Sequence, residues 1–472
     1  MIDSIYLIIR YDFMKKRKKY ILIAASWFTV LLCWQFFSLY IGNKDIFPSA
    51  FQLITAVFYL FSEASFLSAV SSTLLRGICG ILLSLCLAAI LAWRASRSDA
   101  FRTYIHPFLT LLRSVPIISF LFLFLIWFSP EYIPLVMALI TIVPVLTENL
   151  IAGFRNIDHS LLEMSYMYAF SVKQKIKHII YPAVSPYLFS GLISTAGLGW
   201  KAIIMGEALA QPVTGIGVMI REAHGFIEVP RLLAWTLVAV VISYGFELLL
   251  KRAEKYSFPV SFASKDYAEK IMENFPDILN IEGIRKRYGH KILLSELRLS
   301  VSRGEITCLM ASSGYGKTTL LRLLSGLDHA EAGDVPLEKD CKVAFLFQEY
   351  RLLPHLTVCE NIALSRAFCM RKETARKEII EILEQLDMRN CIDRFPGTLS
   401  GGECQRVVLA RMMFFPASLY LLDEPFKGLD FDLKQKVMDY LRKWQVRYGK
   451  TILYVTHQDD ETRIADKIVR IQ

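Results

Sequence analysis

The sequence predicts an α-helical membrane domain of about six transmembrane helices, followed by an α/β domain built around a phosphate-binding loop. Mean hydropathy is +0.38, which is too high for a soluble chain of 472 residues. Apolar residues dominate up to about Leu250, and the chain then becomes charged and mixed. A glycine-rich segment, ASSGYGKTT at 311–319, lies in this second half. We therefore predict a membrane domain over 1–250, a linker over 251–277 and an α/β domain over 278–472.

The first domain contains six apolar runs long enough to cross a bilayer, which takes about 20 residues. They are Tyr20–Ile41, Phe66–Trp93, Tyr104–Phe128, Tyr132–Phe154, Ala183–Ile204 and Arg231–Leu250. Lysine and arginine gather in alternate connections between these runs. The positive-inside rule therefore places both termini and the α/β domain in the cytoplasm, at the inner (plasma) membrane. A shorter run, Ile46–Phe61, is interrupted by Pro48, and we expect it to lie in the membrane interface.

The net charge of +10 does not indicate nucleic-acid binding. Much of it lies in short clusters beside apolar runs, such as 15–19 and 251–252, which are typical of topology signals facing anionic lipid. The nine cysteines include no Cys-x-x-Cys pair and no Cys/His cluster, so they indicate a reducing compartment rather than a disulfide framework. The lipid bilayer is thus an expected partner, and nucleic acid is not.

Five charged residues lie inside apolar runs, where charge is costly and often functional. They are Arg76, Arg113, Glu148, Lys201 and Glu207. Arg76 and Glu148 lie near helix ends, so snorkelling or pairing accounts for them. Lys201 and Glu207 belong to a segment rich in small residues at the end of the fifth run. Two interpretations stay open for them, a role in a translocation path or anchoring at the interface, and the sequence does not show whether they or Arg113 line a path.

Segment 311–319 has the setting that a phosphate-binding loop requires, between a strand-like run at Ile306–Met310 and a helix start. Its glycines let backbone N–H groups approach phosphate closely, and the helix N-terminus adds positive potential. We expect Lys317 to reach the β- and γ-phosphates of ATP and the Thr318 hydroxyl to bind Mg²⁺. Ala311 stands where the usual pattern has its first glycine.

Two later strand-like runs end in polar side chains. The run 418–422 leads into Asp423 and Glu424, which would place Asp423 beside Mg²⁺ and Glu424 where it can polarise a water for attack on phosphate. Taken alone, these carboxylates could equally form an ordinary surface pair. The run 451–456 ends at His457, which either holds the γ-phosphate and the water together or is structural.

Together these motifs resemble those of ABC ATPases, over about Ile278–Gln472. The segment LSGGECQR at 399–406 is similar to the family signature, with Glu403 where the family usually has glutamine. The segment at 428–430 matches the loop that follows the catalytic glutamate. The resemblance implies an α/β P-loop ABC ATPase domain. It also implies that two such domains close face to face, burying two ATP molecules, each between one phosphate loop and the opposite signature.

The resemblance assigns roles to particular positions of this chain, with ATP and Mg²⁺ as cofactors. The catalytic positions are Glu424, His457 and Lys317. The positions that bind nucleotide are Tyr288, which stacks on adenine, and Ser313, Gly314, Gly316, Lys317, Thr318, Thr319, Gln348, Ser400, Gly401, Gly402 and Asp423. The Mg²⁺ positions are Thr318, Gln348 and Asp423.

The connection at 155–182 indicates the direction of transport. It resembles the cytoplasmic coupling loop of ABC importer permeases, whose pattern is Glu-Ala-Ala-x3-Gly-x9-Ile-x-Leu-Pro. Glu163, Ile179 and Pro182 match this pattern, whereas Met164, Ser165, Ala169 and Tyr181 depart from it. A short amphipathic, partly basic helix pair of this kind can dock in a groove of the ATPase and carry its closure to the membrane. The alternative is a solvated basic loop.

The permease as a whole resembles the nitrate/sulfonate/taurine family, which includes importers of thiamine precursors, through segments such as LRSVP at 112–116 and GWK at 199–201. The resemblance implies a homodimeric, ATP-driven importer half-transporter supplied by an extracytoplasmic substrate-binding protein. Its small-molecule solute is an organic anion such as a sulfonate, taurine or nitrate, or a thiamine-precursor pyrimidine. The alternatives are an exporter half, a membrane ABC ATPase doing mechanical or regulatory work, and pairing with a homologous half.

Overall fold

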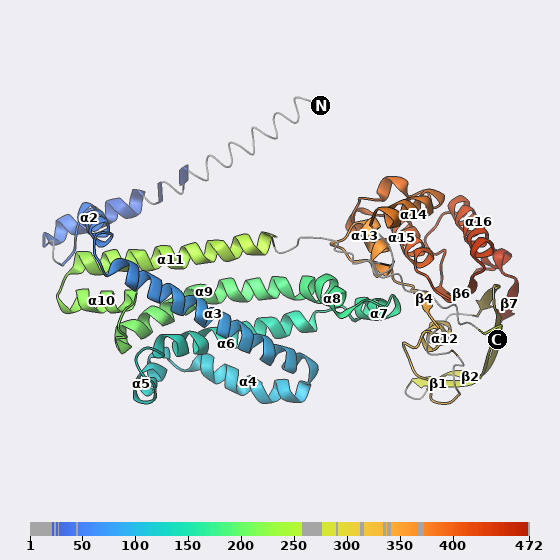
Figure 1. The fold of residues 1–472 in the computed structure, drawn as a ribbon, viewed down its shortest axis with the longest axis horizontal. Coiled ribbons are helices and arrows are strands. Elements are labelled where there is room, and N and C mark those ends of the chain that lie inside the picture. Colours follow the sequence, from blue (N-terminus) through green and yellow to red (C-terminus); the bar gives the residue numbers. More distant parts are fainter. Residues whose placement is uncertain are drawn as a thin grey trace, which may run out of the picture. The chain divides into compact units, whose positions relative to one another are not determined.

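The structure is a computed structural model that describes residues 21–22, 25–26, 28–43, 46–256, 276–288, 291–311, 316–333, 337, 341–366 and 372–470. It divides into two compact units, drawn in Figure 1. The membrane unit comprises Met1–Asn156 and Ala183–Phe258, and the soluble unit comprises Ile157–Pro182 and Pro259–Gln472. The predicted domains follow chain order and assign the loop at 155–182 to the first domain. Contacts instead group 157–182 with the soluble unit.

The membrane unit is helical throughout its described part. Its helices are α2 (Ala50–Leu60), α3 (Phe66–Arg97), α4 (Asp99–Ser114), α5 (Ile117–Trp127), α6 (Ile133–Arg155), α9 (Tyr181–Ala210), α10 (Ile216–Gly225) and α11 (Val229–Tyr256). Among the described residues, four helices are long and apolar enough to cross a membrane: α3, α6, the stretch Val172–Ala210 that ends in α9, and α11. A fifth crossing results if α4 and α5 together form one span.

The remaining apolar runs differ in part from the six predicted spans. The first run is described as a helix over Phe28–Ile41, with its start outside the described residues. The predicted span Tyr104–Phe128 is not one straight helix, because α4 and α5 meet at an angle of 97°. Val115 is extended there, with ψ of 131°, since the following residue, Pro116, disfavours helical geometry in the residue before it.

Two further expectations concern the ends of the membrane unit. The run expected in the interface forms α2, which has 11 residues and is too short to cross a bilayer. Ser49 caps its first turn through a reciprocal pair of hydrogen bonds with Gln52. The predicted linker 251–277 begins as helix, because α11 continues to Tyr256, and residues 257–275 of that linker lie outside the described part.

Small residues allow the long helices to approach closely. A Cβ atom built on Gly77 in α3 would lie 2.3 Å from the ring of Trp200 in α9, and Trp200 is only 1% exposed. Likewise, a Cβ on Gly199 would lie 2.7 Å from Ile142 in α6. Such small-residue contacts are the usual way in which membrane helices gain van der Waals packing. They fix α9 between α3 and α6.

The soluble unit contains two sheets. β1 (Ile278–Tyr288) and β2 (Lys291–Ser302) form an antiparallel pair. The central sheet has the order β4-β5-β6-β3-β7 with every pair parallel. Its strands are β3 (Ile306–Met310), β4 (Val343–Leu346), β5 (Leu419–Asp423), β6 (Thr451–Thr456) and β7 (Lys467–Arg470). The four strands β3 to β6 are buried almost throughout, as parallel strands covered by helices are.

Helices and short 3₁₀ turns connect these strands, and further short helices lie in the loop 157–182. The α-helices are α7 (His159–Met167), α8 (Val172–Lys175), α12 (Lys317–Leu324), α13 (Val358–Ala363), α14 (Lys372–Gln385), α15 (Gly401–Phe414) and α16 (Phe431–Tyr448). A π-helical turn covers Ile176–Ile180, and 3₁₀ turns cover Leu364–Arg366, Arg389–Cys391, Pro396–Thr398 and Asp459–Ile464. The α/β architecture predicted for 278–472 is thus confirmed.

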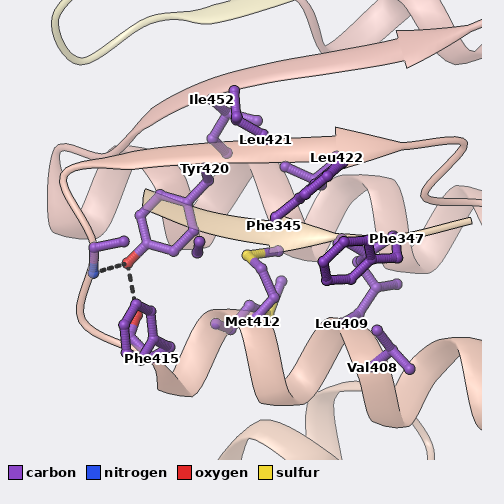
Figure 2. Packing of buried hydrophobic residues seen from close by; sticks show 14 of the residues in the cluster. Phe345, Phe347, Val408, Leu409, Met412, Phe415, Tyr420, Leu421, Leu422 and Ile452 are labelled. Atoms are coloured by element: carbon purple, nitrogen blue, oxygen red, sulfur yellow. Dashed lines mark hydrogen bonds between the residues drawn. The ribbon is translucent and has the colours of Figure 1, made fainter. Parts of the chain in front are cut away.

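Figure 2 shows how α15 packs against the sheet, with Leu409 and Met412 facing Phe345 of β4. Tyr420 of β5 lies in the same core, where its hydroxyl donates to the carbonyl oxygen of Phe415 at 2.9 Å and accepts from the backbone N–H of Ala417 at 3.1 Å. These two bonds hold the turn between α15 and β5. The start of β5, the strand that leads into Asp423 and Glu424, is therefore held by hydrogen bonds to the preceding turn.

We expect Gly77→Ala to lower the thermal unfolding midpoint of the detergent-solubilised protein, because the new methyl group would displace the buried Trp200 ring. Overpacking of this kind costs about 1–3 kcal/mol, which exceeds a gain in helix propensity of at most about 1 kcal/mol. Gly245→Ala in α11 is the matched control, since nothing lies within 4 Å of a Cβ added there. Equal midpoints for the two variants would contradict the close α3–α9 contact.

Candidate active site

The predicted nucleotide residues gather at one edge of the central sheet. Lys317 follows β3, Gln348 follows β4, Glu424 follows β5 and His457 follows β6. Because these strands are parallel, their carboxyl ends lie at the same edge, where open α/β sheets bind ligands. The sheet order therefore brings together side chains that are far apart in the sequence, such as Lys317 and His457, which are 140 residues apart.

The phosphate loop is described at both of its ends. Gly316 adopts φ of 76°, a left-handed conformation that glycine reaches at little cost, immediately before α12 begins. The Lys317 ammonium donates a hydrogen bond to the carbonyl oxygen of Ala311, at 2.5 Å. The side chain of Lys317 thus extends back across the mouth of the loop. Ser313 and Gly314 lie outside the described residues, and Thr319 occupies the first turn of α12.

Thr318 and Asp423 form the direct link between the phosphate loop and β5. The Thr318 hydroxyl donates to Asp423 Oδ2 at 2.7 Å, and Asp423 is only 3% exposed. Burial raises the pKa of Asp423, whereas the Thr318 hydroxyl and the nearby Lys317 charge favour the carboxylate. Two oxygens in this arrangement suit Mg²⁺, which usually takes one or two protein ligands and completes its shell with phosphate and water. No group of three His, Cys, Asp or Glu side chains suited to a metal occurs within the described residues.

Glu424 lies at the centre of the site, in contact with two other predicted residues. Its Oε1 lies 3.2 Å from Nδ1 of His457, and its Oε2 accepts a hydrogen bond of 3.3 Å from the Gln348 amide. The backbone of Glu424 adopts φ of 48°, which is costly for a residue with a side chain, and its N–H donates to the carbonyl oxygen of Val455 at 3.1 Å. The strained turn points the carboxylate away from the strand, towards His457.

Two contacts of this region involve residues that were not predicted. Lys427 Nζ lies 3.7 Å from Glu424 Oε2, so a cation accompanies the carboxylate in addition to His457. The spacing of three residues was visible in the sequence but carries no specificity by itself. The Gln405 amide donates to the carbonyl oxygen of Pro425 at 2.8 Å, which ties helix α15 to the turn after Glu424. Only the fold reveals this second contact.

The signature segment opens helix α15. Ser400 caps the helix and exchanges hydrogen bonds with Glu403, whose carboxylate accepts from the Ser400 N–H at 2.7 Å. Glu403 thus completes a capping box at a position where the family usually has glutamine. The hydrogen bond from the Ser400 N–H lowers the pKa of Glu403. A Cβ on Gly402 would lie 2.9 Å from the carbonyl oxygen of Gly428, so the close approach requires glycine. Ser400 and Gly401 themselves are exposed.

Tyr288 ends β1 and pairs with Lys291 across the β1–β2 turn. Its predicted contact with adenine stays a prediction, because its side chain lies outside the described part.

The loop 157–182 docks onto the soluble unit through one carboxylate. Glu163, in α7, accepts two hydrogen bonds from the Arg322 guanidinium, at 2.7 and 3.0 Å, and one from Arg351 at 2.8 Å. The hydrogen bond from Arg322 is the largest cause that lowers the pKa of Glu163 to about 2, from an ordinary value of 4.5. Arg322 lies in α12, the helix that begins at Lys317. One short helix therefore joins the docked loop to the phosphate loop.

Apolar contacts complete the docking of this loop. Met164 is 1% exposed and Tyr168 is 2% exposed, and both belong to the main core of the soluble unit. The Tyr168 hydroxyl donates to the carbonyl oxygen of Phe345 at 3.4 Å, and its ring meets Phe415 edge to face, with centroids 5.1 Å apart. Ala169 adopts φ of 51°, which explains why the importer pattern has glycine at this position. A solvated basic loop does not fit these contacts.

The charged residues of the apolar runs fall into three situations. Glu207 is fully buried and accepts from Arg76 at 2.8 Å, from the Thr73 hydroxyl at 2.9 Å and from the Gly217 N–H at 3.0 Å. Arg113 pairs with Glu148. Lys201 is exposed and makes no hydrogen bond or ion pair within the described residues. Of the open interpretations, pairing thus accounts for Arg76 and Glu148.

Comparison with known proteins gives two family matches. The profile of the ABC transporter family matches residues 294–427, and that of the binding-protein-dependent transport system inner membrane component matches residues 80–256. The sulfate/thiosulfate import ATP-binding protein CysA of Escherichia coli K12 is 34% identical over 206 residues, covering 40% of this chain and 56% of CysA. The protein of the same name from Halalkalibacterium halodurans is 36% identical over 204 residues, covering 40% of this chain and 57% of that protein.

This chain therefore spans a little over half the length of these curated relatives. Among solved structures, the ATP-binding cassette MJ0796 as a dimer bound to ADP and Pi is 29% identical, covers 41% of this chain and 94% of that chain, and has a TM-score of 0.38.

We expect Glu163→Gln to increase amide hydrogen exchange across 159–170, because the neutral side chain loses its charge-assisted bonds to Arg322 and Arg351. Glu282→Gln, at an exposed position of β1, is the control and should leave exchange in this loop unchanged.

The same contact predicts a pH dependence. Because the pKa of Glu163 is lowered in the folded state, its stabilisation of the docked loop is fully present above about pH 4.5 and is lost as pH falls towards 2. Protection of 159–170 in the parent protein should hold down to pH 5 and then decline towards that of Glu163→Gln. Loss of protection between pH 7 and 5 would contradict this assignment.

Proposed function

Because this chain carries a binding-protein-dependent permease domain and an ABC transporter ATPase domain in one polypeptide, we propose that it is an ATP-driven importer that works as a pair of such chains. The observation that carries the proposal is the double ion pair of Glu163 with Arg322 and Arg351. It ties an importer-type coupling loop to the helix that begins at the phosphate-loop lysine. Nucleotide binding and the membrane helices are thereby mechanically connected.

In the proposed reaction, ATP lies over the carboxyl edge of the sheet. Lys317 would neutralise the β- and γ-phosphates. Thr318, Asp423 and Gln348 would hold Mg²⁺, which would offset the charge that develops on the transferred phosphoryl group. Glu424 orients and polarises the attacking water, and His457 fixes the carboxylate of Glu424 through the contact between Nδ1 and Oε1. Tyr288 stacks on adenine, and Ser313, Gly314, Gly316 and Thr319 line the phosphate cradle.

A second copy of the chain completes each ATP site. Ser400, Gly401 and Gly402 open helix α15, and a helix N-terminus with exposed N–H groups is suited to bind phosphate. Ser400 hydrogen-bonds only within its own first turn among the described residues. We assign these residues to the γ-phosphate of the ATP held by the other copy. A closed, two-fold symmetric dimer satisfies both sites at once.

Direction and partners follow from the permease half. The coupling loop favours import, which requires a solute-loaded extracytoplasmic binding protein, and the distribution of lysine and arginine places both termini and the ATPase in the cytoplasm. The names of the relatives mention sulfate and thiosulfate, which supports an anionic solute such as a sulfonate, sulfate or nitrate. A thiamine-precursor pyrimidine is the alternative solute for the permease family that the sequence resembles.

We expect Glu424→Gln to bind ATP and Mg²⁺ but to hydrolyse ATP at least about 100-fold more slowly than the parent, because a general base contributes about 10²–10⁴-fold. The variant should accumulate as an ATP-bound closed dimer in size-exclusion chromatography with multi-angle light scattering. Glu384→Gln, at a surface ion pair with Arg389, is the control and should hydrolyse ATP at the parental rate. Parental hydrolysis by Glu424→Gln would overturn the assignment.

Import itself is tested in right-side-out vesicles from the source cells. Vesicles that contain the parent chain and ATP should accumulate radiolabelled sulfate or taurine, and vesicles with Glu424→Gln should not. Mass spectrometry of the trapped Glu424→Gln dimer should find an extracytoplasmic solute-binding protein. ATP-dependent accumulation of solute in inside-out vesicles, without such a binding protein, would instead identify an exporter.

A further inference from the structure

Lys201 is a cation on the surface of the membrane unit that has no partner among the residues that the structure describes. Its side chain is exposed and makes no hydrogen bond, ion pair or ring contact within the described residues. By contrast, Glu207 is enclosed by four donor contacts, and Arg113 and Glu148 neutralise each other. Arg76 pairs with both Glu207 and Glu131. Of the five charged residues that the sequence places inside apolar runs, Lys201 is therefore the one whose charge no ion pair within the described residues balances.

Lys201 lies inside α9 and not at either end of the helix. It lies nine residues before the end of α9 at Ala210, or about 14 Å along the helix axis at 1.5 Å per residue. The helix is apolar enough to cross a membrane. An unpaired ammonium that faces acyl chains from such a helix is unfavourable.

The side of α9 that carries Lys201 is distinct from the side that packs. Trp200 and Gly199 face α3 and α6 and are buried. Ser190, Ser194, Leu198 and Lys201 are exposed and recur every three or four residues, which places them on one stripe of the helix. Two hydroxyl groups and an ammonium on one stripe suit water rather than acyl chains.

We propose that Lys201 lines the aqueous solute path between the two copies of the membrane unit and gives that path a positive potential that selects anionic solutes. The inference rests on the proposed function, because a path exists only if the paired chains transport a solute. In a two-fold symmetric pair, two such ammonium groups act on the same path. They attract an oxyanion such as a sulfonate or sulfate and repel cations.

The test measures the local potential with charged thiol reagents at a neighbouring position. Leu198 is 50% exposed and lies three residues before Lys201, so Leu198→Cys reports on the same stripe about 6 Å away. The full-length protein in proteoliposomes is treated on both faces with an anionic sulfonate and a cationic trimethylammonium methanethiosulfonate. Peptide mass spectrometry then gives the rate of modification at residue 198 for each reagent, so the native cysteines do not interfere.

We expect both reagents to reach residue 198, and the anionic reagent to react faster relative to a free thiol in solution. Adding Lys201→Gln should lower the ratio of anionic to cationic rates by on the order of tenfold, the effect of one unit charge at about 6 Å in water on reagents of opposite charge. Lys201→Arg should preserve the ratio. Val241→Cys, on the exposed apolar face of α11, is the control for a lipid-facing thiol and should react with neither reagent.

The inference is overturned if residue 198 reacts no faster than residue 241, or if Lys201→Gln leaves the ratio unchanged. The proposed function is tested separately in the same proteoliposomes, through ATP hydrolysis that requires Mg²⁺ and Glu424. Hydrolysis with an inaccessible residue 198 would reject the path and keep the transporter, whereas no hydrolysis would reject the proposed function whatever the labelling shows.

Discussion

One carboxylate shared by two guanidinium groups holds the loop 157–182 to the rest of the soluble unit. Glu163 lies in a loop between two apolar helices of the membrane unit. Contacts nevertheless group this loop with the soluble unit, where Glu163 bonds to Arg322 and Arg351. Arg322 lies in the last turn of the helix that Lys317 begins. The same helix of eight residues thus carries both the lysine of the phosphate loop and a guanidinium that holds the loop 157–182. Buried apolar side chains around Tyr168 keep this connection from slipping.

The chemistry at the other end of that helix depends on sheet topology. Parallel strands place Asp423, Glu424 and His457 at one edge, and the strained backbone of Glu424 turns its carboxylate towards the histidine. The adjacent Asp423 is buried and bonded to Thr318, so two neighbouring carboxylates have different environments. Helix α15 is tied to the same turn through Gln405, whose amide donates to the carbonyl oxygen of Pro425, the residue after Glu424.

A charged side chain that is removed from water needs a partner, and the charges of the membrane unit illustrate this. Glu207 has its partners within the chain, where they hold the turn before α10 against α3. Arg113 and Glu148 partner each other. Lys201 has none in the described chain, so the partner it requires is water or an anion. Bonding, and not residue type, thus distinguishes the charges that are paired within the membrane unit from Lys201.

The sequence by itself determined the two-part architecture, the phosphate loop, the acidic strand end and the importer pattern of the loop, because each depends on local composition or spacing. It also identified five charged residues in the apolar runs as candidates for function, although the same two interpretations stayed open for Lys201 and Glu207. Only the tertiary structure separated those two, since burial and hydrogen bonding arise from helices far apart in the chain. It also broke the span at 104–128 before Pro116 and paired Glu163 with Arg322, a contact between residues 159 positions apart that no local pattern encodes.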